Sequence, residues 1–87
     1  MSQPRYKVNK NLILQKIDGK LVCFQIDRSH LYVFNDTAEF IFKKIKLKMS
    51  ETKIAALLSK KYEISEETAL KDTIQLIKKF QNNMILV

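Results

Sequence analysis

The spacing of apolar residues changes once along the chain, within residues 31–38. Before this stretch the apolar residues form short runs bounded by turn residues, as in strands. After it they recur every three or four residues, as in helices. Phe34 is the last strand-like residue, Asn35 and Asp36 are helix-capping residue types, and Asp36 and Glu39 have the spacing of a capping box. The pattern predicts a sheet followed by helices, with a sharp junction between them.

The first third of the chain predicts a three-stranded antiparallel meander. Residues 12–17 and 20–26 are apolar runs separated by Asp18-Gly19, a pair that favours a tight hairpin. Residues 27–29 form a second turn, and residues 30–34 form a third strand. This strand ends the sheet and has none of the charges, prolines or bulges that usually protect a sheet edge.

Three helices are expected in the remaining sequence. The first, residues 36–47, has one apolar stripe formed by Ala38, Ile41, Phe42 and Ile45. Ser50 is expected to cap the second helix, whose predicted buried residues are Ile54, Leu57, Leu58 and Tyr62. Ser65 is expected to cap the third helix, which continues towards Met84.

The apolar stripe of the third helix is unusually wide. It contains Leu70, Ile74, Leu76, Ile77 and Phe80. These residues cover an arc of roughly 160°, whereas one core face needs only about 100°. One margin holds Ile74 beside Lys71 and Lys78, and the other holds Leu76 beside Asp72. We therefore expect one edge of the stripe to face something other than the core.

The predicted fold is α+β, a three-stranded antiparallel sheet followed by three helices, similar to a winged helix-turn-helix. The 87 residues leave room for one domain. We expect residues 1–7, which are polar and contain Pro4, to be a flexible arm, and residues 8–87 to be the domain. The apolar residues 85–87 are expected to pack back on it.

The chain is basic, with 16 Lys and Arg against 9 Asp and Glu and a net charge of +7. This charge favours nucleic acid, an acidic peptide or an anionic membrane surface, and does not choose among them. The N-terminal stretch has no apolar run typical of a signal peptide, and no segment approaches the ~20 apolar residues of a membrane span. We expect a cytoplasmic protein with no membrane partner.

No set of catalytic residues is visible. Cys23 is the single cysteine, which excludes an intramolecular disulfide or a multi-thiolate metal site. His30, the single histidine, belongs to no recognisable motif, and one glycine, Gly19, cannot build a glycine-rich phosphate loop. We expect a protein that is not an enzyme and holds no metal or cofactor.

Two functional hypotheses remain. A basic winged-helix domain suggests nucleic-acid binding, but the third helix begins with Glu66 and Glu67, which would face phosphates. Alternatively, an extended peptide adds to the unprotected third strand and places its side chains between this strand and the third helix. A helix, or a second copy in a homodimer, covering that edge is a further alternative, as is a structural subunit of a larger enzyme.

Several residues resemble a known family. Residues 34–38, Phe-Asn-Asp-Thr-Ala, followed by Ile41, are similar to the leucine-asparagine-x-threonine/serine-alanine signature of PqqD-like proteins, also called RiPP precursor peptide recognition elements. Asp72, with Leu76, Ile77 and Phe80, is similar to the family's third helix. The chain departs from the family pattern at Phe34, Thr73 and Asn83, where leucine, valine and glycine are usual.

The resemblance implies a domain without chemistry of its own. Members of the family bind the leader segment of a ribosomally made precursor peptide as a fourth strand and present the peptide to a modifying enzyme. That enzyme is a radical SAM protein, or a leader peptidase with a cyclase in lasso-peptide pathways. Carried over to this sequence, the resemblance implies that the peptide is bound by the backbone of Leu31, Tyr32, Val33 and Phe34 and by the side chains of Leu70, Lys71, Ile74, Ile77 and Lys78. Tyr32 and Phe34 are expected to face the helices, with Leu31 and Val33 on the opposite side.

Overall fold

The sheet comes first in the chain and holds three antiparallel strands in the order β1-β2-β3. The computed structural model describes residues 6–87, with the strands β1 (Leu12–Ile17), β2 (Lys20–Gln25) and β3 (His30–Phe34). Asp18 (φ 51°) and Gly19 (φ 79°) both adopt the left-handed backbone that a tight hairpin between right-twisted strands requires. The predicted meander is confirmed, except that β2 ends one residue earlier, at Gln25.

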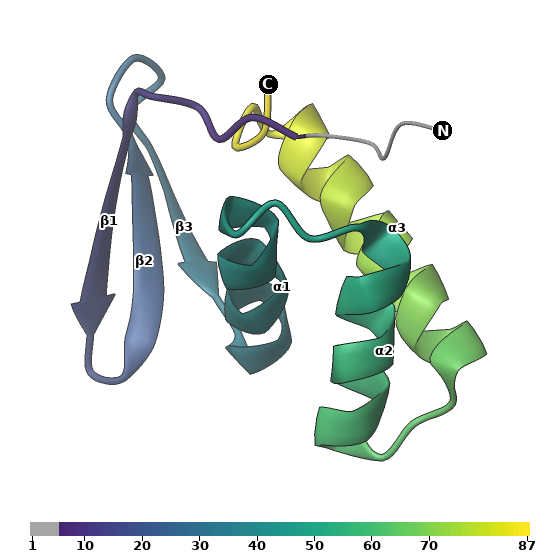
Figure 1. Ribbon diagram of the computed structural model, residues 1–87. Helices are drawn as coiled ribbons and strands as arrows, with labels where there is room; N and C mark the ends of the chain where they lie inside the picture. Colours follow the sequence, from purple (N-terminus) through teal and green to yellow (C-terminus); the bar gives the residue numbers. More distant parts are fainter. Residues whose placement is uncertain (1–5) are drawn as a thin grey trace.

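The helices follow as α1 (Asp36–Lys46), α2 (Glu51–Tyr62) and α3 (Glu66–Asn82) (Figure 1). Each begins after a capping residue whose side chain accepts a hydrogen bond from a free backbone amide: Asn35 from Ala38, Ser50 from Lys53, and Ser65 from Thr68. The predicted α+β class, with three antiparallel strands followed by three helices, is confirmed.

The predicted capping box of Asp36 and Glu39 is wrong. Asn35 caps α1, so Asp36 is the first helical residue and Glu39 lies one position too far along to reach back to the cap. The Glu39 carboxylate instead lies 2.8 Å from Nζ of Lys16 on β1 and 2.9 Å from Nζ of Lys43 on α1. These two ammonium groups hold the pKa of Glu39 below its usual value.

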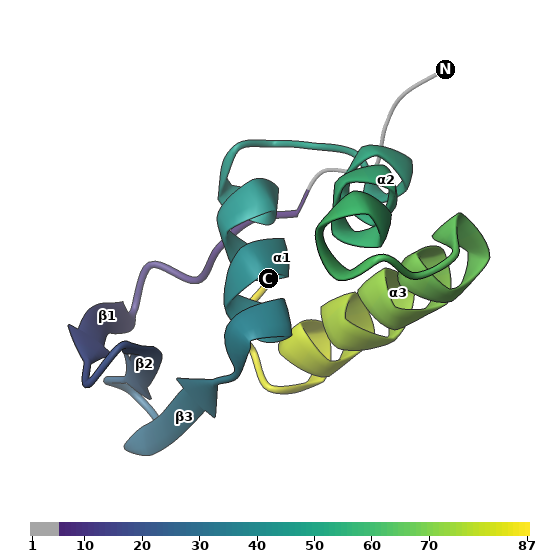
Figure 2. The ribbon, with the colours of Figure 1, turned by 90° about the horizontal axis from the view of Figure 1, so that it is seen from below.

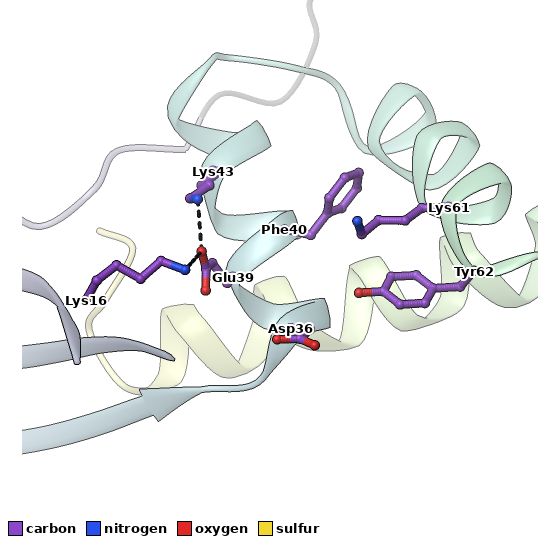
Figure 3. A pocket seen from close by; sticks show the side chains of 7 residues that line it. All are labelled: Lys16, Asp36, Glu39, Phe40, Lys43, Lys61 and Tyr62. Atoms are coloured by element: carbon purple, nitrogen blue, oxygen red, sulfur yellow. Dashed lines mark ion pairs between the residues drawn. The ribbon is translucent and has the colours of Figure 1, made fainter. Parts of the chain in front are cut away.

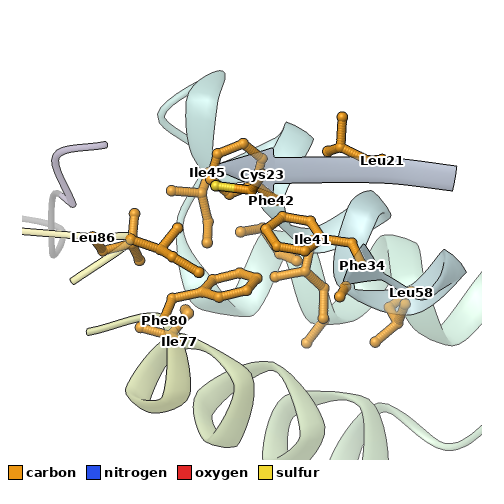
Figure 4. Close-up of a cluster of buried hydrophobic side chains, with 14 of the residues drawn as sticks. Leu21, Cys23, Phe34, Ile41, Phe42, Ile45, Leu58, Ile77, Phe80 and Leu86 are labelled. Carbon is orange, nitrogen blue, oxygen red and sulfur yellow. The ribbon is translucent and has the colours of Figure 1, made fainter. Parts of the chain in front are cut away.

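All three helices lie on one side of the sheet, and the core fills the space between them (Figures 1 and 2). The predicted stripe of α1 is confirmed, because Ala38, Ile41, Phe42 and Ile45 are all buried. Phe34 of β3, Phe42 of α1 and Phe80 of α3 form an aromatic cluster with ring centroids 5.3–5.8 Å apart (Figure 4). Such pairs contribute about 0.5–1.5 kcal/mol each beyond the burial of their area, so this cluster joins the sheet to two helices.

The buried face of α2 differs from the prediction. Ile54 and Leu58 are buried as expected, but Ala55 joins them, while Leu57 is only half-buried and Tyr62 is exposed. Ala55 therefore belongs to the α2 face that is turned to the core. Tyr62 lies at the end of the helix, where its amphipathic side chain keeps the hydroxyl near water.

The two ends of the described chain lie side by side. Val8 forms an antiparallel bridge with Leu86, and the amide of Val87 donates to the carbonyl of Lys7 (2.8 Å). Ile85 and Leu86 are buried, as predicted, whereas Val87 is exposed. Tyr6 donates a hydrogen bond to Glu51, and burial together with this bond raises the pKa of Tyr6 to about 12. Of the predicted arm, residues 1–5 lie outside the described part of the chain, and Tyr6 and Lys7 contact the domain.

Candidate functional site

The backbone of β3 has one free edge, and the register shows which residues it exposes. A two-residue hairpin places hydrogen bonds between Ile17 and Lys20, and the amide of Ile26 donates to Asn11 of the preceding segment (3.0 Å). Even-numbered residues of β2 therefore bond towards β1, and odd-numbered residues bond towards β3. Their partners on β3 are His30, Tyr32 and Phe34. The N–H and C=O groups of Leu31 and Val33 consequently point away from the sheet, where no strand of residues 6–87 pairs with them.

The side chains of β3 alternate between the two faces of the sheet. Phe34 is buried and Tyr32 is half-buried against the core, whereas Leu31 is 62% exposed and Val33 is 59% exposed. This confirms the predicted orientation of the strand. A peptide strand paired with Leu31 and Val33 would send alternate side chains towards the helices.

A groove of about 290 Å³ lies on the helix side of this edge. On β3 and the start of α1 it is lined by Leu31, Tyr32, Val33, Phe34, Asn35 and Ala38. On α3 and the segment after it, the lining residues are Leu76, Lys79, Phe80, Asn83 and Ile85. Most of these lining residues are apolar or aromatic, Asn35 and Asn83 add polar groups, and Lys79 is the single charged residue.

A buried amide holds the two walls of the groove together. Gln25 on β2 is fully buried, and its Nε2 donates to the carbonyl of Asn83 at the end of α3 (2.7 Å). Its Oε1 accepts a long hydrogen bond from the hydroxyl of Tyr32 (3.4 Å). A buried polar side chain with both ends satisfied favours one arrangement of its partners. Gln25 thus fixes the distance between β3 and the last turn of α3.

The groove continues past the start of α1. A second hollow of about 360 Å³ shares Asn35, Ala38, Leu76 and Lys79 with the first, and is extended by Thr37, Asp72 and Gln75. Lys79 forms no ion pair within residues 6–87. The combined surface, which we call the β3–α3 groove, offers Lys79 to a carboxylate and Asp72 to a cationic group of an extended ligand.

The structure brings together some of the predicted site residues and separates others. Leu31, Tyr32, Val33 and Phe34 form one wall of the β3–α3 groove. On α3, the five predicted residues Leu70, Lys71, Ile74, Ile77 and Lys78 do not line it. Ile77 is buried in the core, Leu70 and Ile74 are half-buried, and Lys71 and Lys78 are exposed. Their predicted contact with a peptide is untested by the groove geometry, and substitutions at Ile74, Ile77 and Lys78 test it (see Discussion).

The reason is the rotation of α3 about its axis. Its buried row is Ala69, Thr73, Ile77 and Phe80, and Thr73 fits there because its hydroxyl donates to the carbonyl of Ala69 (2.8 Å). Thr73 is thus a polar residue near the middle of the buried face of α3. The positions of the apolar residues alone would place the centre of that face elsewhere on the helix. The margin holding Leu76 faces the groove, and the margin holding Ile74 does not.

The helix end differs from the family pattern noted above, in which glycine is usual at position 83. Asn83 has a φ of −93°, and Met84 (φ 61°) adopts the left-handed conformation that follows α3. Asn83 keeps its carbonyl directed at Gln25, and its side chain position lies at the end of the groove.

A third hollow, of about 390 Å³, lies on another part of the surface, between α1, α2 and the end of β1 (Figure 3). Phe40 and Tyr62 line it together with Lys16, Asp36, Glu39, Lys43 and Lys61. Nζ of Lys61 lies 5.5 Å from the ring of Phe40 and 5.7 Å from that of Tyr62. The Glu39 carboxylate is already paired with Lys16 and Lys43, so these three charged groups of the hollow interact with one another.

No other chemistry gathers in the part of the chain that the structure describes. Residues 6–87 contain no cluster of three or more potential metal ligands. Cys23 is fully buried, and its burial raises the pKa of the thiol, which disfavours a reactive thiolate. Within the same residues, no helix is long and apolar enough to cross a membrane.

Two solved structures are similar to this fold. One is described as "Lasso peptide synthetase B1 complexed with the leader peptide"; it has a TM-score of 0.91 and 19% sequence identity, and the match covers 97% of this chain and 99% of that one. The other is "TbiB1 in Complex with the TbiA(beta) Leader Peptide", with a TM-score of 0.83, 14% identity and coverage of 92% and 93%. These similarities establish a shared fold.

Sequence comparison identifies the family. No curated protein matches the chain. A family model described as "Coenzyme PQQ synthesis protein D (PqqD)" matches residues 20–86, which include β2, β3 and all three helices. The match covers well over half of the chain and agrees with the resemblance noted at the β3–α1 junction. The chain therefore belongs to the PqqD family.

Proposed function

We propose that this protein binds the leader segment of a ribosomally synthesised precursor peptide and delivers it to a modifying enzyme. The leader adds to β3 as a fourth antiparallel or parallel strand, and its alternate side chains enter the β3–α3 groove. The protein acts in the cytoplasm, where the precursor is made, and the partner enzyme supplies all of the chemistry. That enzyme is a radical SAM protein or a leader peptidase.

The single observation that carries this proposal is the free edge of β3 beside an apolar groove. The outward N–H and C=O groups of Leu31 and Val33 offer a peptide backbone two donors and two acceptors. Leu76 and Phe80 offer apolar contacts on the helix side. The family membership supports the same function, as do the two similar structures, both described as complexes with leader peptides.

The groove also suggests the chemistry of the leader. Apolar side chains at every second position would fill the space between Tyr32 and Leu76. A carboxylate near Lys79 would meet the one unpaired cation of the groove. The net charge of +7 further favours an acidic peptide over a basic one.

The test is a calorimetric titration of the protein with its precursor peptide, comparing two substitutions at one position. Val33→Pro removes an outward N–H without removing a bond to β2, so the sheet survives while one ladder donor is lost. Val33→Ala shortens the side chain but keeps the N–H. We expect Val33→Pro to weaken binding by at least about tenfold, and Val33→Ala to change it by less than about threefold.

Circular dichroism and thermal unfolding establish that both variants are folded. Equal affinities of the two folded variants would show that the β3 backbone does not bind the peptide. Strong binding of random duplex DNA by the unchanged protein, with no binding of precursor, would instead favour the nucleic-acid alternative, because phosphate contacts give a steep salt dependence.

A further inference from the structure

The face of the sheet turned away from the helices is almost entirely apolar. Residues Leu21, Cys23 and Gln25 of β2 are buried towards the helices, so the residues between them point the other way. Val22 and Phe24 of β2 therefore lie on the outer face, and the same alternation adds Ile13 and Ile17 of β1 and Leu31 and Val33 of β3. Ile26, which directly follows β2 and bonds to Asn11 beside β1, continues this face as a seventh apolar residue. Five of the seven, all except Val22 and Phe24, are large exposed apolar residues.

These side chains form one continuous surface. Ile13 lies opposite Phe24, which lies opposite Leu31, so an apolar row crosses all three strands. In the next row Val22 lies between Val33 of β3 and Gln15 of β1, so this row is apolar on two of its three strands. The helices lie on the other side of the sheet, and no element of residues 6–87 covers the outer face (Figures 1 and 2).

An uncovered apolar face of this kind marks an interaction site. Soluble monomers rarely expose contiguous apolar patches of more than a few hundred Å² unless a partner binds there. The outer positions of antiparallel strands are usually polar where they face water. Here the outward positions of β1 and β2 include only Gln15 and Lys20 as polar residues.

We infer that the outer face of the sheet docks the enzyme that processes the precursor, an inference that rests on the proposed function. A leader strand added beside β3 would extend this face, because every second leader side chain would lie next to Leu31 and Val33. An enzyme bound to the outer face therefore touches the domain and the leader together. This places the rest of the precursor beside the enzyme that acts on it.

Charge favours a different protein over a second copy of this chain. The outward strand positions carry one cation, Lys20, and no carboxylate, and the whole chain has a net charge of +7. Two copies would repel each other, whereas a surface with apolar residues ringed by carboxylates would be attracted. The expected partner surface is thus apolar with an acidic rim.

The experiment measures binding of the full chain to the purified enzyme encoded beside the precursor, with and without precursor peptide. Ile13→Thr combined with Ile17→Thr removes apolar contacts on β1 while keeping β-branched residues suited to strands. Leu47→Thr combined with Val87→Thr is the matched control, because these residues are 63% and 61% exposed but belong to none of the three strands. Neither pair includes a residue of the β3–α3 groove.

We expect the Ile13 and Ile17 pair to weaken enzyme binding by at least about tenfold, and the control pair to leave it within about twofold. Both variants should bind precursor peptide as the unchanged protein does. Unchanged enzyme binding by the Ile13 and Ile17 variant would overturn the inference. A wild-type dimer in sedimentation velocity that this variant converts to monomer would overturn it as well, because a second copy would then cover the face.

The two proposals fail separately. If Val33→Pro keeps full affinity for the precursor while the Ile13 and Ile17 variant loses enzyme binding, leader binding at β3 is wrong and the docking face stands. If Val33→Pro loses the precursor and the Ile13 and Ile17 variant keeps the enzyme, the docking face is wrong and leader binding stands.

Discussion

The two margins of the apolar stripe on α3 are alike in sequence but differ in what they face. Each combines one half-buried aliphatic residue with a neighbouring lysine: Leu76 with Lys79, and Ile74 with Lys78. At 3.6 residues per turn, Leu76 and Ile74 lie roughly 160° apart around the helix. Only Leu76 and Lys79 line the β3–α3 groove. A wide apolar stripe thus indicates that a helix contacts two different surfaces, but it does not indicate which margin of the stripe lies against which surface.

Ile77, which lies between the two margins, should show the largest difference between an effect on stability and an effect on peptide binding. Ile77 is buried, and Ile77→Ala should lower the free energy of unfolding by about 2–4 kcal/mol, through lost burial and the cavity it leaves. Affinity for the precursor peptide, measured on the folded protein, should stay nearly unchanged. Urea denaturation and calorimetry provide the two values. A large loss of affinity with little loss of stability would return Ile77 to the binding site.

The aliphatic pair tests the margins directly. Leu76→Ala should weaken precursor binding by about tenfold, because it removes apolar contact from the groove. Ile74→Ala, which removes a similar half-buried side chain from the same helix, should leave the affinity within about twofold. Fluorescence anisotropy of a labelled leader measures both. The reverse order of effects would place the peptide on the margin that the sequence pattern first suggested.

The lysine pair gives the smallest expected effect. Lys79→Glu should weaken binding by about three- to tenfold at low salt, since it reverses the one charge in the lining of the 290 Å³ groove. Lys78→Glu changes the net charge by the same amount but lies outside the groove, so it reports only the long-range effect of charge. When both titrations are repeated at high salt, the peptide affinities of the two variants should become similar. Equal effects at low salt would mean that Lys79 makes no local contact.

Most of the fold could be predicted from local pattern. The Asp18-Gly19 hairpin, the cap at Asn35, and the stripe of α1 each depend on neighbouring residues, and all three have strong local signals. The predicted capping box of Asp36 and Glu39 is wrong, because Asn35 is the cap and Glu39 pairs with Lys16 on β1. Contacts of that kind depend on the tertiary arrangement and leave no mark in the spacing of residues.

The lining of the β3–α3 groove was predictable on its strand side and not on its helix side. A strand has two faces and a register fixed by a tight hairpin, so alternation puts Leu31 and Val33 together on the face opposite Tyr32 and Phe34, which were expected to face the helices. A helix can take any rotation about its axis, and apolar spacing alone does not fix that rotation. In α3 the observed rotation places Thr73, which is polar, in the buried face. The sequence did contain a signal for Leu76. Leu76 and Asp72 lie at one margin of the apolar stripe, and Ile74 lies at the other.

Amide hydrogen exchange along β3 tests the central claim most directly. In the free protein the N–H groups of Leu31 and Val33 point outward and should exchange fast, whereas that of Tyr32 is bonded to β2 and should exchange slowly. Saturation with the precursor peptide should slow Leu31 and Val33 by at least about tenfold and change Tyr32 less, since new ladder bonds form only at the outward groups. Fast exchange at Leu31 and Val33 in the peptide-bound protein would contradict strand addition at β3.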